Sequence, residues 1–244
     1  MMESDALWPA GIRVAVSLTY DGALPEHLDV AGPTLESLGF RGTFFLSPTR
    51  TLENVQGWQT MAEAGHEMGN GCLLGVSDEG RLPNWSLRMV EQDIHMTQAF
   101  FASIFPEAEP ISFAYPGRVP QCEQGSYRRI VEEEFSYSRS AIPGDNRFDE
   151  SKRFFKVRDV TDKSVDELEL WKERFLEEIE DDESEPVWHI LRFGKMFDGE
   201  TNRLLLLHEL CSTFLNSHRD KVWVAPMQTV ASCLESPPIL SLSR

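Results

Sequence analysis

Asp21 lies at a position where an α/β protein usually carries out its chemistry. It ends a short apolar run that begins at Ile12, and Gly22 follows it directly. The run predicts a β-strand, followed by a segment with helical spacing of apolar residues and a second β-rich run at residues 43–46. Barrels and open α/β sheets place their reactive groups at the carboxyl ends of parallel strands. We therefore expect the Asp21 carboxylate to lie in a candidate site.

Strands and helices alternate along the whole chain, and this alternation would position Asp21. Strands are predicted at residues 12–21, 43–46, 111–115, 135–138, 154–157, 187–193 and 222–224, and another is predicted to end near Asn70. Helices are predicted at residues 28–38, 55–64, 87–105, 127–134, 165–179, 203–215 and 229–234. About seven strands separated by helices imply parallel strands covered by helices, which is an α/β fold.

Length and composition indicate one globular domain, residues 1–244. No Pro/Gly/Ser-rich linker divides the chain, and 41% of its residues are hydrophobic. No apolar run approaches the roughly 20 residues that a membrane-spanning helix needs. The first ten residues include Glu3 and Asp5 and do not show the basic and apolar segments of a secretion signal. We therefore expect a cytoplasmic protein without a membrane partner.

Charge and cysteine content exclude some kinds of partner and site. The formal net charge of -17 would repel phosphate backbones, so nucleic acid is not expected as a partner. Ten acidic residues lie within residues 167–185, which predicts the solvated face and end of a helix; the alternative is an acidic docking segment. The four cysteines, Cys72, Cys122, Cys211 and Cys233, are scattered and form no CxxC pair, so we expect reduced thiols.

Several short motifs resemble those of the NodB-type polysaccharide deacetylases, carbohydrate esterase family 4. Ser-Leu-Thr-Tyr-Asp at residues 17–21 resembles the first family motif, and Gly-His-Glu-Met-Gly-Asn at residues 65–70 resembles the approach to the second. Phe-Ala-Tyr-Pro-Gly at residues 113–117 matches the third, and residues 131–139 and 222–227 are also similar. The resemblance spans nearly the whole chain. It implies an irregular, incomplete (β/α) barrel of about seven parallel strands.

The resemblance also implies roles for individual residues. In the family a divalent metal is held by one Asp and two His side chains, while a preceding Asp acts as base. Asp21 matches that base, and Tyr115 with Pro116 matches the turn whose backbone helps to hold the oxyanion. The three ligand positions fall on Gly22, Gly71 and Gly75. Glycine has no side chain with which to bind a metal, so we expect no metal site and no cofactor.

The strand at residues 187–193 resembles the run that, in the family, precedes the His acting as general acid. The residue at that His position in this chain is Gly194. Because side chains alternate along a strand, Arg192 is then predicted to point into the barrel beside Asp21. A guanidinium there could neutralise the carboxylate that a metal balances in the family. We hypothesise an ion pair between Asp21 and Arg192. The alternative is that Arg192 extends into solvent at the strand end.

No other side chain obviously restores a metal site. His66 corresponds to a packed, hydrogen-bonded support in the family, and Cys72 is more typical of a small buried residue. The remaining histidines lie in predicted helices away from the strand ends and are interpreted as surface or structural residues: His27, His95, His208 and His218.

Loss of three ligand side chains could leave a pocket. Tyr20, Tyr115 and Trp188 beside Asp21 could hold a sugar by stacking and hydrogen bonding, although ordinary core packing explains these aromatic residues equally well. The favoured function is a carbohydrate-binding or regulatory pseudoenzyme. The alternative is a hydrolase that cleaves a non-peptide C-N amide or an ester of an N-acylated sugar or small substrate with Asp21 and without the usual metal. A third interpretation is a homo-oligomer that serves as a scaffold.

Overall fold

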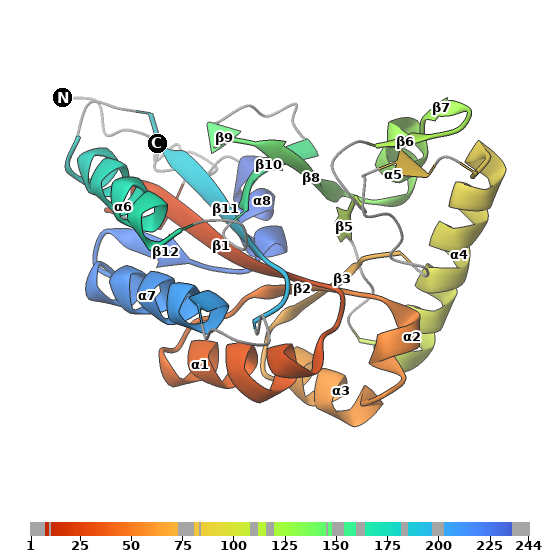
Figure 1. Ribbon diagram of the computed structural model, residues 1–244, viewed down its shortest axis with the longest axis horizontal. Coiled ribbons are helices and arrows are strands. Elements are labelled where there is room, and N and C mark those ends of the chain that lie inside the picture. The colour runs from red at the N-terminus through yellow and green to blue at the C-terminus, as the bar shows by residue number, and fades with distance from the viewer. Residues whose placement is uncertain are drawn as a thin grey trace, which may run out of the picture.

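The computed structural model describes residues 8–9, 11–72, 81–82, 84–107, 112–115, 120–144, 146–147, 154–159, 164–181, 185–196 and 203–235. Seven parallel strands curl into an incomplete barrel with helices on its outer side (Figure 1). In spatial order these strands are β1 (Val14–Asp21), β2 (Thr43–Leu46), β3 (Glu67–Asn70), β5 (Ser112–Ala114), β8 (Tyr137–Pro143), β10 (Phe154–Asp159) and β11 (Val187–Phe193). The predicted fold class is confirmed.

Strand β1 is the centre of the sheet because it pairs with three other strands. Its carboxyl end pairs with β2, most of its length pairs with β11, and its first three residues pair with β12 (Val222–Val224). The connection between β3 and β5 is thin, with the single pair Asn70 and Phe113. A short antiparallel strand, β9 (Asn146–Arg147), extends the sheet beside β11. The barrel is therefore irregular.

The helices occupy nearly the predicted positions. They are η1 (His27–Ala31), α1 (Gly32–Ser37), α2 (Pro48–Thr51), α3 (Val55–Glu63), α4 (Leu87–Ile104), α5 (Arg128–Glu134), α6 (Val165–Glu180), α7 (Arg203–Ser217) and α8 (Met227–Glu235). Ser86 caps α4, and Ser164 with Glu167 forms a capping box at the start of α6. A small sheet was not predicted: β4 (Arg81–Leu82), β6 (Gln121–Cys122) and β7 (Gly125–Ser126).

Side chains of β1 alternate between two environments. Leu18 and Tyr20 pack under the covering helices, whereas Thr19 and Asp21 face the barrel interior with groups from β8 and β11. The interior is therefore partly polar. This explains why the sequence of β1 is a largely apolar run that ends in a carboxylate. Within the described ranges, no helix has the length and apolar character needed to cross a membrane.

Candidate functional site

Asp21 and Arg192 form the predicted ion pair at the carboxyl ends of the strands. Arg192 Nε donates to Asp21 Oδ2 over 2.6 Å. Arg192 is paired in register with Thr19, so its side chain and that of Asp21 share one face of the sheet. The two side chains are 31% and 24% exposed. The hypothesis is confirmed, and the alternative in which Arg192 extends away from Asp21 is excluded.

A second arginine, which the sequence analysis missed, holds Asp21 more deeply. Arg139 Nη2 donates to both carboxylate oxygens of Asp21 over 2.6 Å, and its Nη1 donates to Thr19 Oγ1 over 2.6 Å. Its guanidinium lies 4.7 Å from the centre of the Phe45 ring, and only 2% of the side chain is exposed. Arg139 therefore fills the barrel interior beside Asp21, in the space where the sequence analysis predicts a pocket.

These two arginines determine the ionisation of Asp21. Burial on its own would raise the pKa of the carboxyl group. The charges and hydrogen bonds of Arg139 and Arg192 outweigh burial and lower the pKa of Asp21 to about 2. The carboxylate is therefore ionised at neutral pH but is a weak base.

Two of the three glycines at the expected ligand positions are described, and they differ. Gly22 has a φ of +95°, and a Cβ there would have no neighbour within 4 Å among the residues that the structure describes. A Cβ on Gly71 would lie 2.9 Å from the Leu46 carbonyl oxygen and 3.1 Å from that of Phe45. A side chain at Gly71 would therefore require the backbone of β2 to move. Gly75 lies outside the described residues.

Gly194, at the expected acid position, takes part through its backbone. His27 Nε2 donates to the Gly194 carbonyl oxygen over 2.9 Å, while His27 Nδ1 accepts from Leu24 N over 3.3 Å. His27 is fully buried, and burial lowers its pKa. The interpretation of His27 as structural agrees with these contacts, but its placement away from the strand ends is wrong. It joins the loops that follow β1 and β11.

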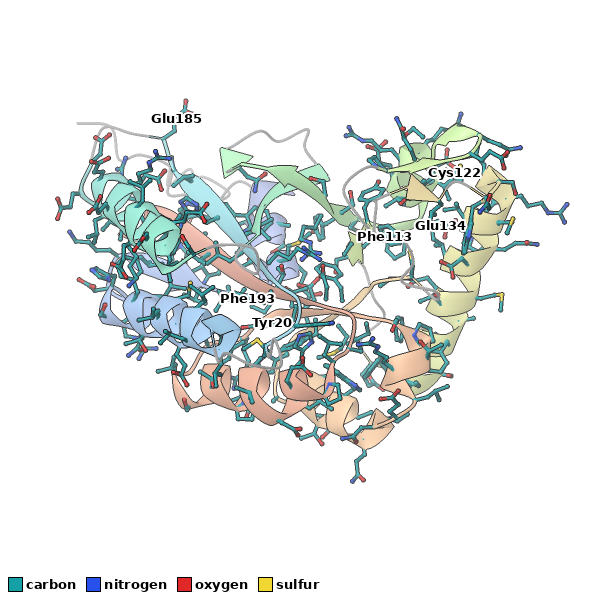
Figure 2. The ribbon with its side chains drawn as sticks, in the orientation of Figure 1. Tyr20, Phe113, Cys122, Glu134, Glu185 and Phe193 are labelled. Carbon is teal, nitrogen blue, oxygen red and sulfur yellow. The ribbon has the colours of Figure 1, made fainter. Side chains whose placement is uncertain are left out.

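The proposed pocket roles of Tyr20 and Trp188 are wrong. Tyr20 is fully buried on the outer side of β1, where its hydroxyl is hydrogen-bonded to His208 Nε2 at 2.7 Å and its ring stacks on Phe193 (Figure 2). Trp188 points inward but is 1% exposed, and its Nε1 donates to Ser17 Oγ over 3.1 Å. Both aromatic residues contribute to the core, as the alternative interpretation stated.

The Tyr115 side chain also belongs to the core. Its ring packs 5.2 Å from that of Phe113 and 5.5 Å from that of Tyr127. Its backbone N–H donates to the Arg139 carbonyl oxygen over 3.1 Å, so this amide takes part in the pairing of β5 with β8. Pro116, the next residue of the predicted oxyanion turn, lies outside the described residues, and the oxyanion role stays a prediction.

The remaining candidate ligands have structural contacts. His66 Nδ1 accepts from Gly42 N over 3.0 Å, and His95 Nε2 lies 3.0 Å from Glu134 Oε1 on the surface. His218 bonds to the Phe214 carbonyl oxygen at 2.8 Å, and Cys72 is buried at a φ of +69°. Among the described side chains, no group of three or more His, Cys, Asp or Glu residues could hold a metal ion.

A family model described as "Polysaccharide deacetylase" matches residues 11–123, which include β1, β2, β3 and β5. Solved structures described as polysaccharide deacetylases also match 93% of this chain in fold. The chain is therefore similar to polysaccharide deacetylases in this part of its sequence and in its fold. None of the curated protein sequences compared with it matches.

Three solved structures share the fold of this chain. A candidate polysaccharide deacetylase from Mycobacterium smegmatis has 17% identity and a TM-score of 0.65, with 93% of this chain and 92% of that chain covered. Puue allantoinase has 15% identity and a TM-score of 0.67, with 93% and 91% covered. A mutant of BA3943, described as a CE4 family pseudoenzyme with restored enzymatic activity, has 14% identity and a TM-score of 0.54, with 90% and 68% covered. The TM-scores show that these proteins share a common fold.

Proposed function

We propose that this chain is a polysaccharide deacetylase-like protein that does not catalyse metal-dependent deacetylation and acts as a carbohydrate-binding or regulatory pseudoenzyme. The observation that carries the proposal is that Arg139 and Arg192 both form ion pairs with the Asp21 carboxylate and together bind both of its oxygens. A family enzyme needs that carboxylate as a base beside a metal cation. Here it is neutralised by two guanidinium groups.

The site's chemistry is a poor fit to a divalent cation. The Asp21 carboxylate already binds two cations, and a metal ion beside it would be repelled by both. The position expected to supply a His ligand, Gly71, has the backbone of β2 where a side chain would begin. Gly22 offers space but has a backbone conformation that favours glycine. We therefore assign no metal to this site.

The same geometry also argues against Asp21 as a strong base. With its pKa lowered to about 2, the carboxylate has little tendency to take a proton from water at neutral pH. Among the described residues, solvent reaches the side chains of Asp21 and Arg192 in part, and Gly22 and Gly71 are also partly exposed. Charged donors and acceptors with exposed glycine backbone can bind the hydroxyl and acyl groups of a sugar.

The proposal is tested by measuring binding and hydrolysis on the same sample. Purified protein is titrated with N-acetyl chito-oligosaccharides in a calorimeter, and acetate release is followed after addition of zinc, cobalt or nickel. We expect binding without acetate release. Arg192→Gln should weaken binding, while Arg129→Gln on the surface of α5 should leave it unchanged. Acetate release that requires a stoichiometric metal and is lost in Asp21→Asn would overturn the proposal.

A second candidate function is a metal-independent hydrolase of a small non-peptide C-N bond. It is favoured by the fold shared with Puue allantoinase, together with the retained Asp21 and Arg192. In that case Arg192 would hold a carbonyl oxygen and Asp21 would orient the attacking water. Hydrolysis of a panel of cyclic amides and ureides in the presence of EDTA, lost in Asp21→Asn, would favour this function over a pseudoenzyme.

A further inference from the structure

The pairing of β1 with β11 ends one residue before Asp21. Its last pair is Tyr20 with Phe193, both labelled in Figure 2, and their rings stack with centroids 5.4 Å apart. At Asp21 the strand is paired with Phe45 of β2, and Gly22 N donates to the Phe45 carbonyl oxygen over 2.9 Å. Within the described residues, the ladder therefore does not fix the end of β11 to the loop that follows Asp21.

The side chain of His27 makes that connection. Its Nε2 lies 2.9 Å from the Gly194 carbonyl oxygen, and its Nδ1 lies 3.3 Å from Leu24 N. A carbonyl oxygen only accepts and a backbone N–H only donates, so the imidazole carries its hydrogen on Nε2 and is neutral. Burial lowers the pKa of His27 and favours the same neutral form. One ring therefore bonds to the backbone after both strands.

A second contact joins the same two segments. The Glu26 side chain, next to His27, accepts through Oε1 from Met196 N over 3.3 Å. His27 begins η1, a π-helical turn in which Gly32 N donates to the His27 carbonyl oxygen, and its ring packs with its centroid 5.4 Å from that of Tyr20. Such turns are rare and occur frequently at functional sites. Adjacent side chains therefore connect the loop after β1 to the backbone after β11.

We infer that His27 is a positioning residue for the pair of Asp21 and Arg192. Gly194 follows Arg192 by two residues, so the bond from His27 to its carbonyl oxygen fixes the end of β11. This keeps Arg192 Nε at 2.6 Å from Asp21 Oδ2. The role belongs to the two hydrogen bonds of His27 and not to the volume of its ring. Its consequence for sugar binding rests on the proposed function, whereas its effect on the ion pair does not.

His208 offers a matched control. Both histidines are fully buried and pack against the Tyr20 ring, with centroids 5.4 Å away for His27 and 5.7 Å away for His208. The side chain of His208, however, is hydrogen-bonded to Tyr20 Oη at 2.7 Å on the outer side of β1. Its replacement removes a ring of the same size and a buried hydrogen bond but leaves the bonds to Leu24 and Gly194 in place.

The coupling free energy between Asp21 and Arg192 measures the positioning without any ligand. It is obtained from urea denaturation of the full chain with Asp21→Asn, Arg192→Met, both changes or neither. The cycle is repeated in the His27→Leu and His208→Leu backgrounds. We expect the coupling to fall by about half or more in His27→Leu and to stay unchanged in His208→Leu. An unchanged coupling in His27→Leu overturns the assignment, and so does an equal fall in both backgrounds.

Two milder variants separate the hydrogen bonds from the packing of the ring. The Gln side chain in His27→Gln can donate to Gly194 and accept from Leu24, so most of the coupling should be kept. The shorter side chain in His27→Asn can accept from Leu24 but does not reach Gly194, so the coupling should fall as in His27→Leu. These variants also decide the question if His27→Leu does not fold. Equal coupling in His27→Gln and His27→Asn would overturn the role of the bond to Gly194.

Titration with N-acetyl chito-oligosaccharides tests the consequence for binding. His27→Asn should weaken binding in the same direction as Arg192→Gln, whereas His208→Leu should leave the affinity unchanged. Wild-type affinity in His27→Asn would overturn this consequence. A wild-type protein that binds none of these sugars counts against the proposed function, and the coupling measurement then still decides whether His27 positions the pair.

Discussion

Two carboxylates, one partly and one fully buried, face the interior of this barrel, and the protein compensates for their charges in different ways. Asp21, at the carboxyl ends of the strands, is held by the guanidinium groups of Arg139 and Arg192. Glu67, on β3, is 3% exposed and accepts hydrogen bonds from the neutral groups Thr43 Oγ1, Ser112 Oγ and Gln228 N. The first carboxylate has cations as partners, whereas the described partners of the second are neutral hydrogen-bond donors.

The pKa values follow this difference. Burial raises the pKa of Glu67, and the hydrogen bonds offset that effect only in part. Burial acts on Asp21 too, but two positive charges reverse the sign and lower its pKa to about 2. Glu67 joins β2, β3 and β5 to the amino end of α8, which suits a structural role. Full charges are concentrated at the end of the barrel where the family site lies.

The largest loss of unfolding free energy is expected from Arg139→Met. This change removes the deeper partner of Asp21 and the bond to Thr19, and it leaves a largely buried carboxylate with one cation. Breaking a buried pair by removing one partner costs about 3–5 kcal/mol of unfolding free energy. Urea denaturation at pH 7 measures the loss.

Arg192→Met is the matched control for that experiment. Arg192 is 31% exposed, so solvent can partly replace it, and we expect a loss of about 1–2 kcal/mol. Equal losses in the two variants would contradict the view that Arg139 is the internal partner and Arg192 the accessible one.

The second prediction concerns the missing ligands. Gly71→His should lower the unfolding free energy by about 1–3 kcal/mol because its Cβ would press on the carbonyl groups of Leu46 and Phe45. For the same reason the triple variant Gly22→Asp, Gly71→His, Gly75→His should fail to bind zinc in a calorimetric titration while Arg139 and Arg192 are present. Stoichiometric zinc binding by a folded triple variant would show that the site still tolerates a metal.

The third prediction uses the lowered pKa of Asp21. Because the folded-state pKa is about 2, below the ordinary value of 3.8, the stabilisation is complete above pH 4 and is lost as the pH falls toward 2. The loss should be about 2 kcal/mol in wild type relative to Asp21→Asn over this range. Denaturation midpoints of both proteins at several pH values test it; parallel profiles would contradict the assigned pKa.

The fourth prediction is that the Glu67 contribution to the unfolding free energy changes with pH in the direction opposite to that of Asp21. Since burial raises the pKa of Glu67 above 4.5, the folded state favours the protonated form, and wild-type stability should fall as the pH rises from 4.5 through the folded-state pKa. Glu67→Gln should cost roughly 1 kcal/mol at pH 4, because an amide replaces part of the acceptor, and less at higher pH. A cost that grows with pH would mean that Glu67 behaves like Asp21.

The sequence predicted the fold better than the site. Apolar periodicity located almost every long strand and helix, and alternation along β11 placed Arg192 beside Asp21. The same rule applied to β8 would have placed Arg139 two residues after the inward Tyr137, but no local signal distinguishes a buried arginine from a surface one. Tyr20 and Trp188 illustrate the converse, because aromatic residues near a site are more often core than binding surface.

Backbone strain at the strand ends gives the smallest predicted effect. Ala23, next to Gly22, has a φ of +53°, a left-handed conformation that costs a non-glycine residue about 1–2 kcal/mol. Ala23→Gly should relieve that cost but lose a buried methyl group and add unfolded-state entropy, so its unfolding free energy should stay within about 0.5 kcal/mol of wild type. Ala31→Gly, equally buried but with a φ of -63°, gains no such relief and should lose about 2 kcal/mol. Urea denaturation of both variants measures the contribution of this strain to the unfolding free energy. Equal losses of unfolding free energy in Ala23→Gly and Ala31→Gly would mean that the backbone after Asp21 is not strained.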